Sequence, residues 1–327
     1  MQKKFKMVHT QLRNIHTRGD ILFLFMGSGS VGSLYGGLLA SIGQEVILIG
    51  RKNHVKAINE NSLEIQGLIN KNITIPAFDV ISETSRKDLK FIFFTTKAHQ
   101  LEAAAIQIKE IITKNTILVS LQNGLDTENV IQDIYPENMV LRAVTSIGVC
   151  RPRPGLIDYT GLGQTLIGYK NKNEEKVAAN LVSLFNQAGI SAQLEPNISG
   201  AVFSKVIVNC GLNPLAALYQ VKNIEVFNQI ELRNLATELA REAWTVAQEL
   251  DIDLKVDNPI IYMFDVIKKT GNNINSMLRD VREKRKTEID FINGKIVELG
   301  LKLNVDVPQN QDIYKKVKAL EKSYLDS

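Results

Sequence analysis

The sequence ILFLFMGSGSVGSLYGGLLASIGQEVILIG, residues 21–50, decides the fold. It opens with a short apolar run that is typical of a buried strand, and a glycine-rich turn follows. An amphipathic pattern then predicts a helix to about Ile42, and EVILIG predicts a second strand. A strand, a glycine turn, a helix and a strand within about thirty residues are the setting in which a GxGxxG motif is informative. The segment therefore predicts a dinucleotide-binding domain of the Rossmann type.

Each glycine of the motif has a separate expected task. Gly27 permits the tight turn, Gly29 lets a pyrophosphate approach the backbone, and Gly32 lets the helix pack closely on the strand. The N-terminus of the helix offers unpaired N–H groups to the phosphates. The predicted cofactor-binding turn comprises Gly27, Ser28, Gly29, Ser30, Val31 and Gly32.

The residues after the second strand indicate which nicotinamide cofactor binds. An acid at this place would accept hydrogen bonds from the adenosine ribose and repel an added phosphate. The chain instead has Gly50, Arg51, Lys52 and Asn53. Two cations without a carboxylate favour the 2′-phosphate of NADP, which Arg51 can bind with its planar guanidinium. The alternative is that Arg51 and Lys52 only begin a surface loop.

Further strands and helices alternate beyond this unit. FIFFTT leads to Lys97 and TILVSLQ leads to Asn123, so both residues lie past the carboxyl ends of predicted parallel strands, where open α/β sheets bind ligands. Short β-like runs at 63–65 and 73–77 predict a small extra pairing. Further expected elements are a strand at 139–149, turn-linked strands within 154–170, a helix at 174–188 and a short strand at 192–194.

The strand patterns stop near Pro196, and long helical periodicity follows. The expected fold class is therefore α/β, with a Rossmann-type NADP-binding domain at residues 21–196 and a mainly α-helical domain at residues 197–327. Residues 1–20 carry five Lys and Arg residues and no acid before Asp20. We interpret them as a disordered extension or an overlong start, in preference to an organellar presequence.

The segment FSKVIVNCGLNPLAAL, residues 203–218, places polar groups within an apolar helix pattern. Lys205, Asn209 and Asn213 recur at four-residue steps and so share one face of a helix. Pro214 is expected to kink or end this helix and to free a carbonyl near that face, which would suit a small polyoxygenated ligand. The alternative is a structural network in which the asparagines satisfy the kinked backbone and Lys205 extends to water.

Composition excludes several classes of function. The 327 residues suffice for two domains, and 44% hydrophobic with 23% charged residues is ordinary for a globular protein. A net charge of +4 points neither to nucleic acid nor to a membrane surface. Cys150 and Cys210 lack metal-ligand spacing and favour a reducing compartment, with the cytoplasm as the expected location and no metal site.

The polar segment NNINSMLRDVREKRKTEIDFING, residues 272–294, interrupts the aliphatic helices. Asn273 and Ser276 precede a short apolar pattern, and Thr287 begins a helix-start signal that predicts Glu288 in the first turn of a helix. The basic run at 279–286 alternates with acids and lacks aromatic residues, so we interpret it as a solvated face and expect no nucleic-acid partner.

Elimination narrows the choice of proton donor for hydride transfer. All four histidines, His9, His16, His54 and His99, lie in the first third of the chain, so the helical domain cannot supply a histidine acid. The chain also lacks an HExxH motif and a paired-carboxylate metal pattern. Lys205 is therefore the expected donor, because an ammonium can polarise a ketone and protonate the alkoxide.

Five segments follow one another in a recognisable order: GSGSVG from Gly27, TTKAHQ around Lys97, LQNG around Asn123, SKVIVNCGLNPLAAL from Ser204 and NINSMLRDVREKRKTEIDFING from Asn273. Together they resemble the ketopantoate reductase (2-dehydropantoate 2-reductase) family over nearly everything after Ile21. The late segments discriminate better than the glycine turn does. The resemblance implies NADPH-dependent reduction of 2-dehydropantoate to (R)-pantoate for pantothenate and coenzyme A biosynthesis.

The resemblance implies roles for matching residues of the helical domain. Lys205 would be the general acid that hydrogen-bonds the ketone oxygen of the substrate. Glu288 would contact the substrate beside that oxygen and support the lysine. Ser276 would bind the substrate carboxylate, and Asn209 and Asn213 would receive its terminal hydroxyl.

For the remaining positions, the resemblance implies that Asn273 lies near the substrate and that Lys97 and Asn123 line the junction of nicotinamide and substrate. The three motif glycines and Arg51 match cofactor positions. Gly50 and the long N-terminal extension depart from the family pattern.

Alternatives remain open at each level. Ser276 could be only a helix cap, Glu288 could only stabilise a helix dipole, and Asn123 before Gly124 could be turn chemistry. The protein could instead be a related reductase of another branched or opine-like 2-oxo acid, or a non-catalytic NADP-binding redox sensor. Apolar faces of the helical domain could be buried internally or across a homodimer. The expected partner is a small-molecule 2-oxo acid, with no membrane.

Overall fold

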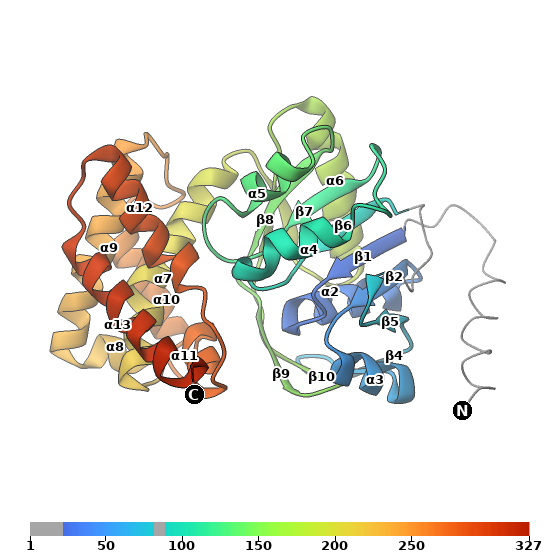
Figure 1. The fold of residues 1–327 in the computed structure, drawn as a ribbon, viewed down its shortest axis with the longest axis horizontal. Coiled ribbons are helices and arrows are strands. Elements are labelled where there is room, and N and C mark those ends of the chain that lie inside the picture. Colours follow the sequence, from blue (N-terminus) through green and yellow to red (C-terminus); the bar gives the residue numbers. More distant parts are fainter. Residues whose placement is uncertain (1–21, 82–88, 327) are drawn as a thin grey trace.

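The computed structural model describes residues 22–81 and 89–326, and Figure 1 shows them as two lobes. The lobe on the right contains the sheets, and the lobe on the left contains α7 and the helices that follow it. The expectation for residues 1–20 lies outside the described residues.

The first lobe alternates strands and helices as the sequence pattern predicts. Its elements are β1 (Leu22–Met26), α2 (Ser30–Ser41), β2 (Glu45–Ile49), α3 (Lys52–Asn61), β3 (Leu63–Gly67), β4 (Lys71–Ile73), β5 (Ala77–Phe78), β6 (Phe91–Phe94), η2 (Ala98–Gln100), α4 (Leu101–Gln107), β7 (Ile117–Ser120), α5 (Thr127–Ile134), β8 (Val140–Thr145), β9 (Gly148–Arg153), β10 (Leu156–Gly161), β11 (Thr165–Gly168), α6 (Lys172–Gln187) and β12 (Ala192–Glu195).

The main sheet has eight strands in the order β12-β11-β8-β7-β6-β1-β2-β5. All neighbouring pairs are parallel except β11 with β8. The chain builds the sheet outward from β1 through β2 to β5 and then returns to the other side of β1 with β6. The order of strands therefore reverses between β1 and β6, and the carboxyl ends of these two strands form the crevice in which open α/β sheets bind ligands.

Both faces of the main sheet are covered, which explains why its strands are apolar throughout. Phe23 and Phe25 point to the face that packs on α2 and α6, whereas Leu22 and Leu24 point to the face that packs on α4 and α5. Phe25 and Phe93 stack across neighbouring strands with ring centroids 4.7 Å apart. The α/β prediction for this part of the chain is confirmed.

A second sheet of four strands, in the order β4-β3-β10-β9, packs beside α2. The predicted extra pairing is present as the antiparallel pair of β3 and β4. The single strand predicted over residues 139–149 is wrong, because β8 ends at Thr145 and β9 begins at Gly148 in the other sheet. Only Ser146 and Ile147 separate the two strands, so the β-like pattern hid the change of sheet.

The second lobe is helical and is built around one long helix. Its elements are α7 (Ile198–Tyr219), α8 (Asn223–Asn228), α9 (Ile230–Glu249), α10 (Pro259–Lys269), α11 (Ser276–Arg282), η3 (Ile289–Phe291), α12 (Asn293–Leu303) and α13 (Pro308–Leu325). Helix α7 packs against α8, α9, α10, α11 and α13, and against β8 and β11 of the first lobe. Among the described helices, only α7 has the length and composition of a membrane span, and 83% of its apolar window is buried inside the protein.

Pro214 does not end α7, which continues to Tyr219, so the expected helix end is wrong. A proline removes the hydrogen bond to the carbonyl four residues earlier, which is that of Cys210. The buried Asn293 donates its Nδ2 to this carbonyl at 3.2 Å and to Asn310 Oδ1 at 3.0 Å. The freed carbonyl is therefore paired within the core and is not the ligand floor that the sequence suggested.

Candidate active site

The glycine turn lies at the reversal point of the sheet, between β1 and α2. Gly27 has a φ of +103°, and a Cβ atom there would lie 2.5 Å from the Thr96 backbone nitrogen. A Cβ atom on Gly32 would lie 2.4 Å from the Gly27 carbonyl oxygen, whereas one on Gly29 would meet no atom closer than 4.0 Å. Close packing thus requires the first and third glycines, and the second faces open space.

The start of α2 fits an anionic group. The first turn of this helix contains no acidic side chain, and no side chain caps it. The backbone N–H groups at Ser30, Val31 and Gly32 belong to the first turn, where N–H groups have no partner within the helix. These groups and the open space at Gly29 fit a pyrophosphate, as the motif predicts.

Packing against the glycine turn explains why residue 50 is glycine. A Cβ atom on Gly50 would lie 1.7 Å from Ser28 Oγ. Ser28 is buried, and its Oγ has no hydrogen-bond partner among the described residues. A larger residue at position 50 would therefore require the Ser28 hydroxyl to turn away.

Two arginines lie near the end of β2 where the adenosine ribose is expected. Arg51 precedes α3 and is exposed. Arg151, on β9, points its Nη1 towards the Ser28 carbonyl oxygen at 3.5 Å. Burial lowers the pKa of Arg151, and the positive charges of Arg51 and Arg285 lower it further. Sequence reasoning missed Arg151, because nothing in the strand pattern brings β9 to the glycine turn.

Lys97 follows β6 and extends from the first lobe to the second. Its Nζ lies 2.7 Å from Asp280 Oδ2 on α11 and 3.4 Å from Glu288 Oε2. Burial alone would lower the pKa of Lys97, but Glu288 and Asp280 outweigh burial and raise it. Lys97 therefore stays charged and connects the two lobes.

Glu288 is 5% exposed and accepts three hydrogen bonds from the first lobe. Its donors are Ala98 N at 3.2 Å, Lys97 Nζ at 3.4 Å and Asn123 Nδ2 at 3.3 Å. Burial acts to raise the pKa of Glu288, but Lys97 and these hydrogen bonds outweigh it and hold the pKa below its usual range. The residue is thus an ionised carboxylate at the junction of the lobes.

The expected position of Glu288 in the first turn of a helix is wrong. Glu288 lies in a bend directly before the short 3₁₀ helix η3. Thr287 Oγ1 accepts a hydrogen bond from Ile289 N at 3.2 Å, so the helix-start signal forms a local turn and no α-helix follows it until Asn293. The irregular backbone directs Glu288 towards the first lobe.

Lys205 lies on α7 and points towards the carboxyl ends of β7 and β8. Its Nζ donates to Asn123 Oδ1 and to the Thr145 carbonyl oxygen, each at 2.7 Å. An ammonium has three donors, so one N–H remains for a ligand. Burial lowers the pKa of Lys205 to about 8, the charge of Arg142 adds to this effect, and Glu288 opposes it.

Asn123 joins the lysine to the carboxylate. Its Oδ1 accepts from Lys205, and its Nδ2 donates to Glu288. The next residue, Gly124, has a φ of +95°, and a Cβ atom there would lie 2.7 Å from Phe291 Cβ. The turn after β7 thus presses directly on η3, and Asn123 does more than form a turn.

The two asparagines of α7 follow Lys205 along one face of the helix, as predicted. Asn213 is 4% exposed, and Asn209 is partly exposed. Within the described part of the chain, neither carboxamide forms a hydrogen bond. They do not bind the backbone near Pro214, which the structural alternative required.

Asn273 lies on the loop before α11, and Ser276 is the first residue of that helix. Both are exposed. Asn275, not Ser276, caps α11 by accepting a hydrogen bond from Leu278 N at 3.0 Å. The helix-cap alternative for Ser276 is therefore wrong, whereas its contact with a substrate stays a prediction.

Besides Arg151, sequence reasoning missed two charged residues near Lys97 and Lys205. Asp280 is 1% exposed and receives Lys97 on one oxygen and Arg285 on the other, at 3.1 Å. Arg142 is 4% exposed in the middle of β8. A single charge inside an apolar strand was a signal that could have identified Arg142. Asp280 lies four residues after Ser276 and could have been found from its place on the same helix face.

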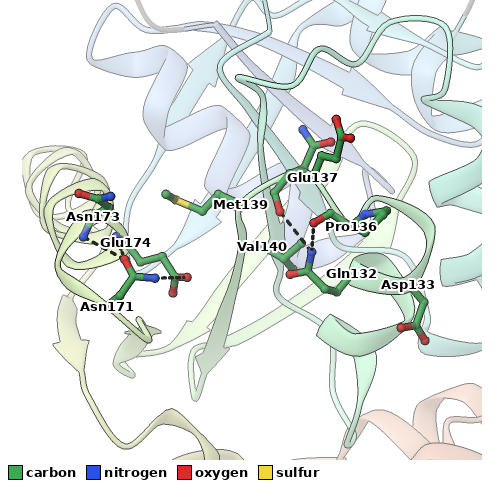
Figure 2. A pocket seen from close by; sticks show the side chains of 10 residues that line it. Gln132, Asp133, Pro136, Glu137, Met139, Val140, Asn171, Asn173 and Glu174 are labelled. Atoms are coloured by element: carbon green, nitrogen blue, oxygen red, sulfur yellow. Dashed lines mark hydrogen bonds between the residues drawn. The ribbon is translucent and has the colours of Figure 1, made fainter.

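A cavity on the surface of the first lobe lies elsewhere (Figure 2). It measures about 720 Å³ and is lined by residues of α5, the loop after it and the start of α6. Gln132 and Asn171 in its wall are already bonded to backbone and to Glu174. None of the predicted site residues lines it. Residues 22–81 and 89–326 also contain no group of three or more His, Cys, Asp or Glu side chains that could hold a metal ion.

The parallel sheet, its glycine turn and a helical lobe that carries an interlobe lysine define the class of two-domain dinucleotide-dependent oxidoreductases. The family model for ketopantoate reductase PanE/ApbA matches residues 23–172, and the model for its C-terminal domain matches residues 197–321. The chain belongs to the ketopantoate reductase family.

Named relatives and solved structures agree with this assignment. A 2-dehydropantoate 2-reductase of Pyrococcus horikoshii is 36% identical over 90% of this chain and 96% of the relative. One of Streptococcus pyogenes serotype M18 is 30% identical over 92% and 98%. A PanE/ApbA family ketopantoate reductase from Ralstonia eutropha JMP134 matches with a TM-score of 0.86 at 27% identity, over 93% of this chain and 99% of that chain. A D-mandelate dehydrogenase with NADH and anilino(oxo)acetate matches with the same TM-score, identity and coverage.

Proposed function

We propose that the protein reduces 2-dehydropantoate to (R)-pantoate with NADPH, the step that supplies pantoate for pantothenate and coenzyme A synthesis. One observation carries the proposal. The Lys205 ammonium lies between the lobes, bonded through Asn123 to Glu288, at the carboxyl ends of the strands that follow the glycine turn. Family membership and the names of the relatives support this choice of substrate.

Lys205 is the proposed general acid. Asn123 and the Thr145 carbonyl hold its Nζ with two of its three hydrogens and leave the third for the ketone oxygen. A pKa of about 8 makes Lys205 a stronger acid than an ordinary lysine while keeping it mostly protonated at neutral pH. A bound nicotinamide dinucleotide supplies the hydride to the ketone carbon. Lys205 gives one proton to the oxygen and regains it from water.

The helical lobe supplies the proposed substrate contacts. Asn209 and Asn213 extend the line of Lys205 along α7, and their carboxamides are unpaired within the described residues. Buried polar groups of this kind are costly unless a ligand or water meets them. We assign them to the terminal hydroxyl, Ser276 to the carboxylate, and Asn273 to the same region.

The first lobe supplies the proposed NADPH contacts. The turn from Gly27 to Gly32 would hold the pyrophosphate, and Lys97 and Asn123 would line the nicotinamide end. Arg51 and Arg151 would hold the 2′-phosphate, since Arg51 lies just past β2 and Arg151 lies beside the glycine turn. Residue 50 also carries no acid that would favour NADH.

The direct test is ketopantoate-dependent oxidation of NADPH, compared with NADH, and followed by nicotinamide absorbance. We expect turnover with a clear preference for NADPH. The matched variant is Lys205→Ala, which should lose about 100- to 10,000-fold in kcat, the usual contribution of a general acid, and should keep its affinity for NADPH. Near-normal turnover of this variant would refute the role of Lys205.

A second candidate activity follows from the D-mandelate dehydrogenase, which matches this fold as well as the Ralstonia ketopantoate reductase does. The protein could reduce another 2-oxo acid. Because the D-mandelate dehydrogenase structure contains NADH, the second candidate activity could also use NADH in place of NADPH. A panel of aliphatic and aromatic 2-oxo acids, assayed with both cofactors, separates the candidates by kcat/KM. Binding of NADPH without turnover on the whole panel would favour the redox-sensor alternative.

A further inference from the structure

Arg142 is a buried cation within β8 that the proposed reaction does not use directly. Its guanidinium donates five hydrogen bonds. The acceptors lie at the end of β7, in the turn after β7 and on Ala143, the next residue along β8. The acceptors are Ser120 O, Ser120 Oγ, Ala143 O, Gln122 O and Gly124 O. Burying a charge is costly without such partners, so this cation has a structural task at this place.

Two of the five hydrogen bonds enclose Asn123. Arg142 Nη2 donates to Gln122 O and to Gly124 O, each at 2.9 Å. These carbonyls belong to the residues directly before and after Asn123, whose carboxamide bonds Lys205 on one side and Glu288 on the other. We propose that Arg142 is a positioning residue: it clamps the backbone on both sides of Asn123 and so fixes the carboxamide that orients Lys205. The inference rests on the proposed function of Lys205.

The other polar groups of the turn after β7 bond elsewhere and do not hold the backbone beside Asn123. Gln122 uses its side chain to bond Ser120 and Thr96, and Leu125 N bonds Phe291 O at 3.2 Å. No other described side chain donates to the carbonyls on either side of Asn123. The planar guanidinium can meet several carbonyls at fixed spacing, whereas a lysine ammonium at the same place could not span them.

The clamp also places a positive charge near the general acid. Glu128 Oε2 lies 3.2 Å from Arg142 Nε on the side away from the carbonyl contacts and partly balances the charge. The charged groups that face Lys205 are Arg142 from β8 and Glu288 from the segment before η3, and they act on its pKa in opposite directions. Replacing Arg142 should therefore affect both the geometry and the acidity of Lys205.

Two substitutions separate these effects. Arg142→Lys keeps the charge and loses the clamp, so kcat should fall by about 100-fold, as for a displaced catalytic group, while the basic limb of the pH profile keeps its position. Arg142→Gln loses both, so kcat should fall and the basic limb should move to higher pH. Arg153→Gln on β9 is the matched control, because Arg153 is exposed and its one ion pair among the described residues is with Glu64, and it should keep wild-type kcat.

A double-mutant cycle with Asn123→Ala tests whether Arg142 acts through Asn123. If it does, adding Arg142→Lys to Asn123→Ala should lower kcat by less than threefold, because the clamped side chain is already gone. Additive losses would overturn the inference, as would wild-type kcat in both Arg142 variants. Circular dichroism and Tm identify variants that fail to fold, and Arg142→Lys, which keeps the positive charge, is then the variant that decides.

Competitive acetylation distinguishes failure of this inference from failure of the proposed function. The pH dependence of Lys205 acetylation, read by mass spectrometry, reports its pKa without any substrate. If the wild-type protein reduces no 2-oxo acid, the proposed function fails alone. A Lys205 pKa that rises in Arg142→Gln and stays in Arg142→Lys would still support the proposed effect of the Arg142 charge on Lys205, and a pKa unchanged in both would overturn that effect.

Discussion

Asn123 Oδ1 and Lys205 Nζ lie 2.7 Å apart, although one residue follows β7 in the first lobe and the other lies on α7 in the second. The same carboxamide bonds Glu288, and Lys97 reaches Asp280 across the same junction. The proposed acid, its support and the cofactor side of the site are thus assembled only where the lobes meet. Substitutions at this junction should therefore alter both the pKa of Lys205 and the turnover.

The pH profile of the wild-type protein should show the acidity of Lys205. A general acid must be protonated, and burial lowers the pKa of Lys205 to about 8. We expect kcat/KM to be level below this pH and to decline as pH rises through about 8. A profile that stays level to the ordinary range of lysine would contradict the assignment.

Asn123→Asp should move the decline of kcat/KM to higher pH. The substitution keeps the shape of the side chain and adds a negative charge beside Lys205, which stabilises the ammonium and raises its pKa. The new carboxylate also faces Glu288, so kcat should fall. The pH profile and kcat check both effects, and Asn129→Asp on exposed α5 is the control with the same chemical change.

Glu288→Gln should have the opposite effect on the pH profile. Glu288 raises the pKa of Lys205, so loss of its charge should shift the decline of kcat/KM to lower pH. The folded protein should also lose about 1–3 kcal/mol of stability at neutral pH, because buried donors lose a charged acceptor. The pKa of Glu288 is depressed by folding, so its contribution exists at neutral pH and disappears as pH falls through the folded pKa. Urea unfolding at several pH values measures it, and an equal loss at all pH values would be inconsistent with an ionised Glu288.

Arg51→Ala should weaken NADPH binding selectively. A charge-assisted contact with the 2′-phosphate is worth about 1.5–3 kcal/mol, so the KM for NADPH should rise about 10- to 100-fold with little change for NADH. Lys52→Ala is the neighbouring control and should have a smaller effect, because a lysine cannot form the paired contacts of a guanidinium. Equal changes for both cofactors in Arg51→Ala would remove the proposed phosphate contact.

Gly124→Ala should push the turn after β7 away from η3. The backbone at Gly124 has a φ of +95°, and the added Cβ atom would meet Phe291 Cβ at 2.7 Å. We expect a loss of about 1–3 kcal/mol of stability and a lower kcat. Thermal unfolding and turnover check this, and Gly189→Ala provides a comparison, since Gly189 has a similar φ of +82° but open space around it.

The sequence predicts the parts of the fold that repeat one pattern over many residues. The strand-turn-helix-strand unit of residues 21–50 and the parallel sheet are confirmed, because apolar runs and glycine spacing are local signals. Pro214 was misjudged, because its effect depends on Asn293, which lies far along the chain. The β8–β9 break was missed for a similar reason, since only the three-dimensional fold shows where the chain changes sheets.

The candidate site could be predicted as a set of residues but not as a network. The structure joins Lys97, Asn123, Lys205 and Glu288 through hydrogen bonds, whereas the substrate contacts of Asn209, Asn213, Asn273 and Ser276 stay predictions. Local patterns could not show that Asp280 holds Lys97, because the contact joins residues on different lobes. The geometry of such pairs depends on how the lobes dock.

The contact between Gly50 and Ser28 bears on any attempt to redesign the coenzyme choice of this protein. An aspartate at position 50 would place its Cβ 1.7 Å from the serine hydroxyl, which is the free end of a short side chain. The hydroxyl would have to turn away, or the acid could stand one place further along the chain. A designer would therefore vary residues 28 and 50 as a pair.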